Sequence, residues 1–219
     1  MSAQDKALRV CLVLPPLTQL NTAYPSVSYL ARHLREHGWS CGQRDLGIEL
    51  FLKVFSQAGL AQVFEELRQA EALPGPAWEA LAYEAQHLKV VEPVMAFLQG
   101  RDPSLAYRIL HTPFLPRGPR LDAVDDSLFS AMDLQDAARY RASLYLNDLV
   151  DLVRACVDPG FELNRYQHHL ALGPTVFEPL SERLSETTLV DSMLDDLADS
   201  VDADVACLSV PFPGNLYGA

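Results

Sequence analysis

Residues 205–219 read VACLSVPFPGNLYGA, and this is the most informative segment of the chain. An apolar run passes through Ser209 into a loop rich in proline, glycine and asparagine. Buried strands of parallel sheets end in this way where the carboxyl edge of the sheet carries a ligand-binding loop. The segment therefore predicts a strand over about residues 204–210, followed by a loop at that edge.

The beginning of the chain has the same organisation. Residues 8–14 read LRVCLVL and predict a buried strand, which runs into the loop 15–24. Residues 25–38 predict a helix that packs on one side, because their apolar positions recur at helical spacing. Residues 39–45 predict a second, more polar strand, which favours an edge position. Together these elements form a βαβ unit.

The long middle of the chain, from Ile48 to about Asp199, contains little strand signal and several amphipathic helical patterns. These patterns cover residues 60–67, 78–99, 133–157 and 190–197. Pro93 is expected to kink or split the second pattern, because proline removes a helical hydrogen bond. Residues 113–119 predict a stiff extended connector between helical groups.

The sequence thus predicts an α/β fold with an incomplete, Rossmann-like parallel sheet of spatial order 2-1-3. A large all-helical insertion separates strands two and three. We expect residues 1–47 with 203–219 to form the Rossmann-like half domain and residues 48–202 to form the helical subdomain. The outer edge of strand three has no predicted neighbour, and uncovered apolar edges promote aggregation. We therefore expect a partner, or a further part of the protein, to cover this edge.

The charge balance excludes several partners. The 219 residues include 17 basic and 29 acidic side chains, for a net charge of −12. Nucleic-acid binding needs clustered lysine and arginine, and anionic lipid repels an acidic surface, so neither partner is expected. The sequence has no apolar run long enough for a membrane span and no signal-peptide pattern at its start, which favours a cytoplasmic protein.

The cysteines are expected to be structural. Cys11, Cys41, Cys156 and Cys207 are too far apart in sequence for a zinc or redox motif. Buried cysteine usually packs as a small apolar residue, and disulfides are not expected in the cytosol. We therefore predict free thiols that pack in the core.

Three segments carry a family resemblance: residues 20–26 (LNTAYPS), 43–50 (QRDLGIEL) and 209–217 (SVPFPGNLY). They resemble the N-terminal region of radical S-adenosylmethionine proteins with a cobalamin-binding (B12-binding) domain. In that family a Rossmann-like cobalamin-binding domain precedes a partial barrel with an iron–sulfur Cys-x3-Cys-x2-Cys motif. The resemblance implies the cofactor-binding part of such an enzyme. S-adenosylmethionine and the 4Fe-4S cluster would then bind to a C-terminal radical SAM domain outside this chain.

The chain departs from the family pattern in two places. Cobalamin modules often place Asp-x-His-x-x-Gly after the first strand, and the histidine coordinates cobalt. Here residues 16–22 read PLTQLNT, so cobalamin would bind without an axial histidine from this loop. The chain also contains no Cys-x3-Cys-x2-Cys. We therefore expect neither catalytic residues nor metal ligands in it, and this part alone would not catalyse radical chemistry.

The candidate cofactor site consists of two loops that should meet at one sheet edge, since their strands are neighbours. The candidate cofactor-binding residues are Thr18, Gln19, Leu20, Asn21, Thr22, Tyr24, Ser209, Val210, Pro211, Phe212, Gly214 and Asn215. Their polar and backbone groups would hydrogen-bond the amides of a planar ligand, and Tyr24 and Phe212 would supply apolar contact. Alternatively, these residues only build turns, because asparagine, serine, glycine and proline are common turn formers.

Other residues that suggest chemistry have a structural interpretation. His33 and His37 are one helical turn apart, but the pair is interpreted as part of a solvated helix face. The aspartates of residues 191–199 are interpreted in the same way. Asp45 ends the second strand, where dinucleotide-binding folds place a ribose-binding acid, yet the Gly-x-Gly-x-x-Gly turn is absent. Ser209 lacks the Gly-x-Ser-x-Gly context of a hydrolase.

Two functions of different class remain open. The chain is either the cofactor-binding module of a radical S-adenosylmethionine enzyme, or an interaction domain with a vestigial Rossmann-like scaffold that binds no corrinoid. The loop sequences favour the first function, and the absent histidine favours the second.

Overall fold

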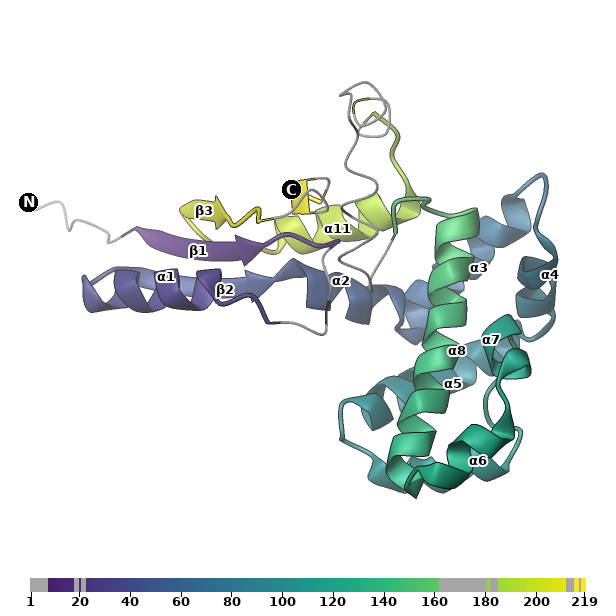
Figure 1. The fold of residues 1–219 in the computed structure, drawn as a ribbon. Coiled ribbons are helices and arrows are strands. Elements are labelled where there is room, and N and C mark those ends of the chain that lie inside the picture. Colours follow the sequence, from purple (N-terminus) through teal and green to yellow (C-terminus); the bar gives the residue numbers. More distant parts are fainter. Residues whose placement is uncertain are drawn as a thin grey trace, which may run out of the picture. The chain divides into compact units, whose positions relative to one another are not determined.

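Strand β1 (Arg9–Leu14) forms the centre of a parallel sheet in the computed structural model (Figure 1). The structure describes residues 8–17, 20, 23–161, 181, 185–211, 215–216 and 218–219. Strand β2 (Ser40–Asp45) pairs with one edge of β1 and strand β3 (Val205–Leu208) with the other. The order β2-β1-β3 and the helical insertion between β2 and β3 confirm the predicted α/β fold.

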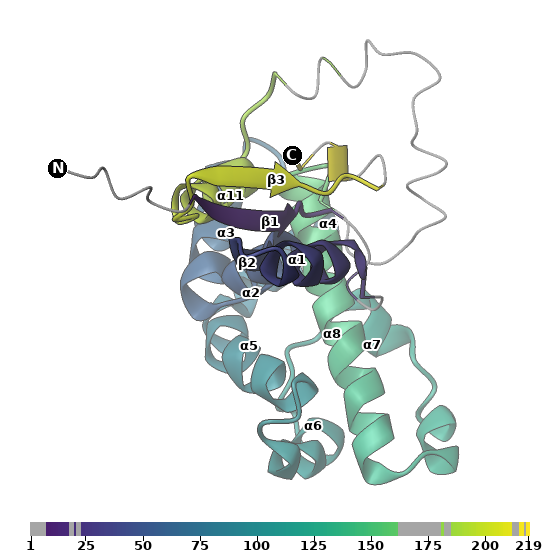
Figure 2. The same cartoon turned by 90° about the vertical axis from the view of Figure 1, so that its left-hand side faces the viewer.

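Both faces of β1 are buried, as its continuous apolar run predicts. Successive side chains of a strand point to opposite faces, so β1 contributes to two clusters. On one face β1 packs against α1 (Ser26–Glu36), in a cluster of Val10, Leu12, Leu14, Val27 and Ala31. On the other face it packs against α11 (Leu189–Asp199), in a cluster of Cys11, Val13, Leu46, Leu194 and Leu197. Figure 2 shows the strands in the order β3, β1, β2 with both helices beside them.

Helix α11 lies in the stretch that the sequence assigned to the helical subdomain, yet it packs on the sheet. The reason is topological. A crossover between parallel strands must return along a face of the sheet, and α11 is the last helix before β3. The crossover into β3 therefore belongs structurally to the sheet.

Charged side chains connect the ends of the sheet elements. Arg9 N donates to Asp204 Oδ2 at 2.8 Å, and Asp204 N donates to Arg9 O at 2.9 Å, which joins the starts of β1 and β3. The Arg44 side chain of β2 pairs with Glu49 in the helix that follows, and its Nη1 donates to Ser200 Oγ at 2.8 Å. Arg44 thereby links β2 to the end of α11.

The chain divides into two compact units, residues 1–52 with 162–219, and residues 53–161. The first unit contains the sheet with α1 and α11. The second is helical, and the boundary falls within α2. The helices are α2 (Leu46–Val54), α3 (Gln57–Gln69), α4 (Gly75–Ala82), α5 (Glu84–Leu98), α6 (Ala106–His111), α7 (Pro119–Ala123) and α8 (Leu134–Cys156), with 3₁₀ turns at Pro103–Leu105 and Asp126–Ala131.

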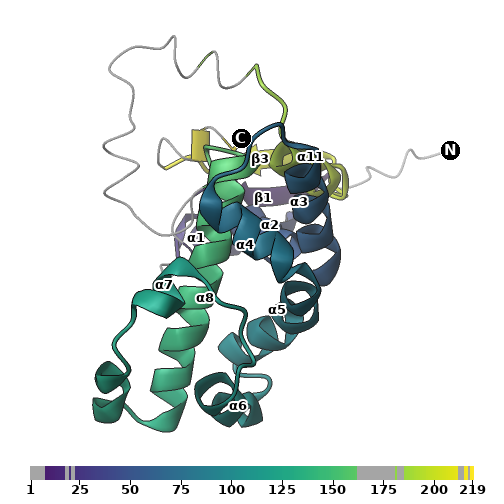
Figure 3. The ribbon, with the colours of Figure 1, turned by 90° about the vertical axis from the view of Figure 1, so that its right-hand side faces the viewer.

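Helix α8 organises the second unit. It contacts α5, α6 and α7, and Figure 3 shows α7 beside it. The helix begins after Asp133, whose Oδ1 accepts a hydrogen bond from Asp136 N at 2.8 Å. Its bounds agree with the predicted helix over residues 133–157.

The expected split at Pro93 is wrong. Helix α5 runs through Pro93, and the break between α4 and α5 lies at Tyr83. Proline removes one helical hydrogen bond, but α5 buries apolar side chains on both sides of it, including Val90 and Val94. Tertiary packing of this face stabilises the helix across the proline.

The cysteines differ in exposure. All four are free thiols, and Cys11 is buried as expected. Cys207 is exposed, as are the other residues of β3. The expectation of core packing is therefore wrong for Cys207.

A buried imidazole lies in the core of the second unit. His87 of α5 is 4% exposed, and its ring centroid lies 5.6 Å from the ring centroids of both Phe64 and Tyr145. His87 Nδ1 lies 3.3 Å from Tyr145 Oη. Burial lowers the pKa of His87 to about 4 and raises the pKa of Tyr145 above its usual range. Both side chains are therefore neutral near neutral pH.

The substitution Leu12→Ala tests the central role of β1. Leu12 is 3% exposed, so removing its side chain should lower the free energy of unfolding by about 2–5 kcal/mol in urea denaturation. Leu30→Ala on α1 is the control, because Leu30 is 50% exposed and its loss should cost less than about 0.5 kcal/mol. Equal effects of the two substitutions would contradict the assignment of β1 as the core strand.

The depressed pKa of His87 predicts acid sensitivity of the helical unit. The unfolded chain protonates this imidazole near pH 6.5, whereas the folded chain does so only near pH 4. Stability should therefore fall as the pH drops from about 6.5 to about 4, by up to about 3 kcal/mol, and this component should then level off. Hydrogen exchange of α5 and α8 amides across this range measures the loss. His87→Phe should remove this component, so an unchanged pH slope in that variant would rule out His87 as its source.

Candidate functional site

The loops after β1 and β3 begin at the same edge of the sheet. The two strands are parallel neighbours, so their carboxyl ends lie side by side. Ser209 N donates to Val13 O at 2.8 Å, which extends the pairing one residue past β3. The predicted parallel pairing of the first and last strands is confirmed.

A pair of serine hydroxyls joins the two loops. Ser26 Oγ lies 2.8 Å from Ser209 Oγ, so one hydroxyl donates to the other. Ser26 is the first residue of α1, and Ser209 directly follows β3; both are half-buried. Sequence reasoning named Ser209 but missed Ser26. The available signal was a serine at the start of the helix that follows the first strand.

Asn215 holds the second loop against the first. Its side chain is fully buried, and Nδ2 donates to Pro15 O at 2.7 Å and to Pro16 O at 3.3 Å. Buried carbonyls need donors, and Asn215 supplies one to each of two consecutive prolines. Its Oδ1 is also buried and has no hydrogen-bond partner among the described residues.

Close backbone packing encloses the turn at Pro16. A Cβ on Gly218 would lie 2.8 Å from Pro16 Cγ and 3.0 Å from Pro16 O, which is too close for any other residue without a shift. The next residue, Leu17, is buried and has a φ of 63°, in the left-handed region that non-glycine residues rarely adopt. The turn therefore depends on the glycine and on the contacts around it.

The structure describes half of the predicted cofactor-binding residues. Ser209 and Leu20 are half-buried, and Val210 and Pro211 are exposed. Tyr24 packs against the cluster between β1 and α1, and Asn215 is buried against the first loop. Six predicted residues lie outside the described part of the chain: Thr18, Gln19, Asn21, Thr22, Phe212 and Gly214.

The described side chains of the two loops are uncharged. Besides the hydroxyls of Ser26 and Ser209, the described part of the second loop exposes apolar side chains, with Val210 41% and Leu216 55% exposed. Hydroxyl and apolar groups suit a neutral ligand that carries amide or hydroxyl groups. Within the residues that the structure describes, these loops supply no strong acid or base for proton transfer.

Asp45 has a structural role at the end of β2. Its Oδ1 accepts a hydrogen bond from Ile48 N at 3.1 Å, so the carboxylate caps the first turn of α2. Asp191 has a similar role, because it forms a reciprocal capping box with Thr188 at the start of α11. Both carboxylates therefore stabilise helix starts.

The histidine pair at the end of α1, His33 and the C-cap residue His37, is exposed. The ring centroids of His33 and His37 lie 4.2 Å apart, and His37 Nδ1 lies 2.8 Å from His33 O. Over the described ranges of the chain, no group of three or more histidine, cysteine, aspartate or glutamate side chains is arranged to hold a metal ion.

Comparison of the chain with protein-family models, with curated protein sequences and with solved structures gave no match in any of the three. In the part of the chain that the structure describes, no helix combines the length and apolar character needed to cross a bilayer.

The substitution Gly218→Ala tests the enclosed turn. The added methyl would collide with Pro16, so we expect a loss of about 1–3 kcal/mol in the free energy of unfolding of the sheet unit. Gly42→Ala in β2 is the matched control, since its Cβ would meet no atom within 4 Å. It should be neutral or slightly stabilising in the same urea denaturation. The packing is misassigned if alanine is tolerated equally at both positions.

Proposed function

We propose that the sheet unit is a cobalamin-type cofactor-binding module that acts as the N-terminal part of a radical S-adenosylmethionine enzyme. The supporting observation concerns two of the segments that resemble this family, residues 20–26 and 209–217. Their residues Ser26 and Ser209 are 183 positions apart in sequence, yet their hydroxyls share a hydrogen bond at one sheet edge. In open α/β sheets this edge is where ligands bind.

The described loop residues fit the chemistry of a corrinoid. A corrinoid has a planar, largely apolar macrocycle with amide groups at its periphery, so it needs neutral hydrogen-bonding partners and apolar contacts. The hydroxyls of Ser26 and Ser209 would bind the amides, and the exposed Val210 and Leu216 would contact the macrocycle. Asn215 would hold the shape of the second loop, because its amide already donates to the first loop. The bound corrinoid would supply a cobalt centre that can exchange a ligand.

The chain's own contribution would be binding and orientation. Residues 15–26 contain no histidine, so this loop would give cobalt no imidazole ligand. The 219 residues contain no Cys-x3-Cys-x2-Cys, so the iron–sulfur cluster and S-adenosylmethionine would belong to a further domain.

Retention of hydroxocobalamin tests this proposal. The full chain is incubated with hydroxocobalamin and desalted, and visible absorbance is measured on the protein fraction. We expect stoichiometric retention by the natural sequence and none by Ser209→Trp, whose indole would fill the space beside the serine pair. The matched control is Ser40→Trp, since Ser40 is exposed at the opposite edge of the sheet. A colourless natural protein, or equal retention by the two variants, would refute the proposal.

An interaction domain is the second candidate, and exposure of β3 favours it. Leu208 is 52% exposed and Val205 40%, and no strand in the described residues pairs with the outer edge of β3. Such an edge pairs readily with another chain. The Rossmann-like half would then be a scaffold without corrinoid. A colourless protein that self-associates in sedimentation velocity would support this function over the first.

A further inference from the structure

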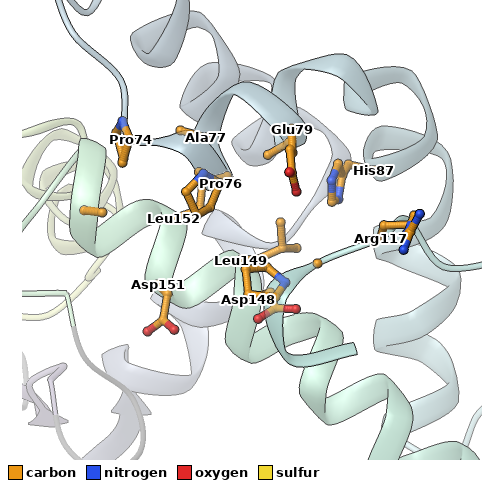
Figure 4. Close-up of a pocket in the computed structure, with 14 residues that line it drawn as sticks. Pro74, Pro76, Ala77, Glu79, His87, Arg117, Asp148, Leu149, Asp151 and Leu152 are labelled. Atoms are coloured by element: carbon orange, nitrogen blue, oxygen red, sulfur yellow. The ribbon is translucent and has the colours of Figure 1, made fainter. Parts of the chain in front are cut away.

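The helical unit contains a cavity of about 200 Å³ that is separate from the sheet edge. Its lining comes from α4, the buried His87 of α5, the segment 117–119 and the last turns of α8. Figure 4 shows α4 side chains on one side of the hollow and α8 side chains on the other. Buried apolar residues, among them Ala77, Leu149 and Leu152, form most of its inner wall. Exposed lining residues, including Glu79 and Ala155, mark its opening to solvent.

Three charged residues of the lining, Arg117, Asp148 and Asp151, form ion pairs with Arg120 or Asp122. Asp148 accepts hydrogen bonds from Arg120 N and Arg120 Nη1 at 3.2 and 3.3 Å, and Arg120 also pairs with Asp151. Arg117 Nε donates to Asp122 Oδ1 at 3.3 Å. The Arg120 pairs connect α8 to the 117–122 segment, and the Arg117–Asp122 pair lies within that segment. An anionic ligand would face Glu79, Asp148 and Asp151. Arg117 and Arg120 already offset these carboxylates, so the lining favours an uncharged ligand.

His87 lines the cavity and carries a hydrogen-bonding group that no described residue uses. Its Nδ1 lies 3.3 Å from Tyr145 Oη, and its Nε2 is buried without a partner among the described residues. Leaving a buried polar atom unpaired is costly, so such an atom calls for a ligand or a water.

We assign the proton of the His87 ring from the contact with Tyr145. This is the one hydrogen bond that the Tyr145 hydroxyl makes to the described residues, so we assign the hydroxyl as donor to His87 Nδ1. In the neutral ring the proton is then on Nε2. Burial keeps the ring neutral, since it lowers the pKa of His87 to about 4. The free group is therefore an N–H donor.

We propose that this cavity binds a small uncharged molecule that has one apolar ring or chain and one hydrogen-bond acceptor, which pairs with His87 Nε2–H. A cavity of about 150 Å³ with apolar walls accepts benzene, so a volume of about 200 Å³ suits one ring with a short substituent. The site is independent of the proposed corrinoid site.

Two isosteric probes test the donor. Acetophenone carries a carbonyl acceptor, and α-methylstyrene replaces that oxygen with a CH₂ group. We expect both to bind, with acetophenone about five- to tenfold tighter because it alone accepts the hydrogen bond. Titrations followed by ¹H–¹⁵N NMR of the full chain measure both affinities. Long-range ¹H–¹⁵N spectra of the His87 ring should show a protonated Nε2 that shifts with acetophenone and not with α-methylstyrene.

Two variants test whether the probes bind in this cavity. Ala155→Phe places a ring at the exposed end of the cavity lining and should abolish binding of both probes. Ser143→Phe adds the same ring to an exposed position of α8 outside the lining and should leave both affinities unchanged. No binding of acetophenone, equal affinities for the two probes, or full binding by Ala155→Phe would each overturn the proposal.

Discussion

The burial of β1 on both faces is the constraint on which the sheet unit depends. A parallel strand between two neighbours must be covered from both sides, and here α1 covers Val10, Leu12 and Leu14 while α11 covers Cys11 and Val13. Two crossover helices are therefore needed, one before β2 and one before β3. Their return directions bring the carboxyl ends of β1 and β3 to one edge, so the position of the candidate site follows from the core.

Backbone carbonyls that need a hydrogen-bond donor shape that edge. Pro15 and Pro16 cannot donate hydrogen bonds, and their buried carbonyls accept from Asn215 across the sheet edge. Buried polar groups in the helical unit also need hydrogen-bond partners, but not all of them have one among the described residues. There a buried nitrogen of His87 has no partner in the described residues, and the residue lines a cavity. In the first case the protein satisfies the two proline carbonyls, and in the second it leaves a ring nitrogen without a partner among the described residues.

The sequence indicated the sheet better than it indicated the sites. Continuous apolar runs identified β1 and β3, and the polar run ending at Asp45 identified the edge strand β2. Local propensity misplaced the break in the α4–α5 region, because tertiary packing of α5 outweighs the single Pro93. Ser26 and His87 were missed for a related reason. A serine at a helix start or a histidine on an apolar face has no distinctive pattern, and its role depends on residues distant in sequence, Ser209 and Tyr145.

The pairing of β1 with β3 has a consequence for synthesis. Arg9 and Asp204, which join the starts of these strands, are 195 positions apart. At translation rates of roughly 5–20 residues per second, β1 leaves the ribosome roughly 10–40 s before β3 is complete. During this interval an apolar strand has one ladder edge open in the nascent chain. Chaperone binding to the emerging polypeptide would be most useful in that window.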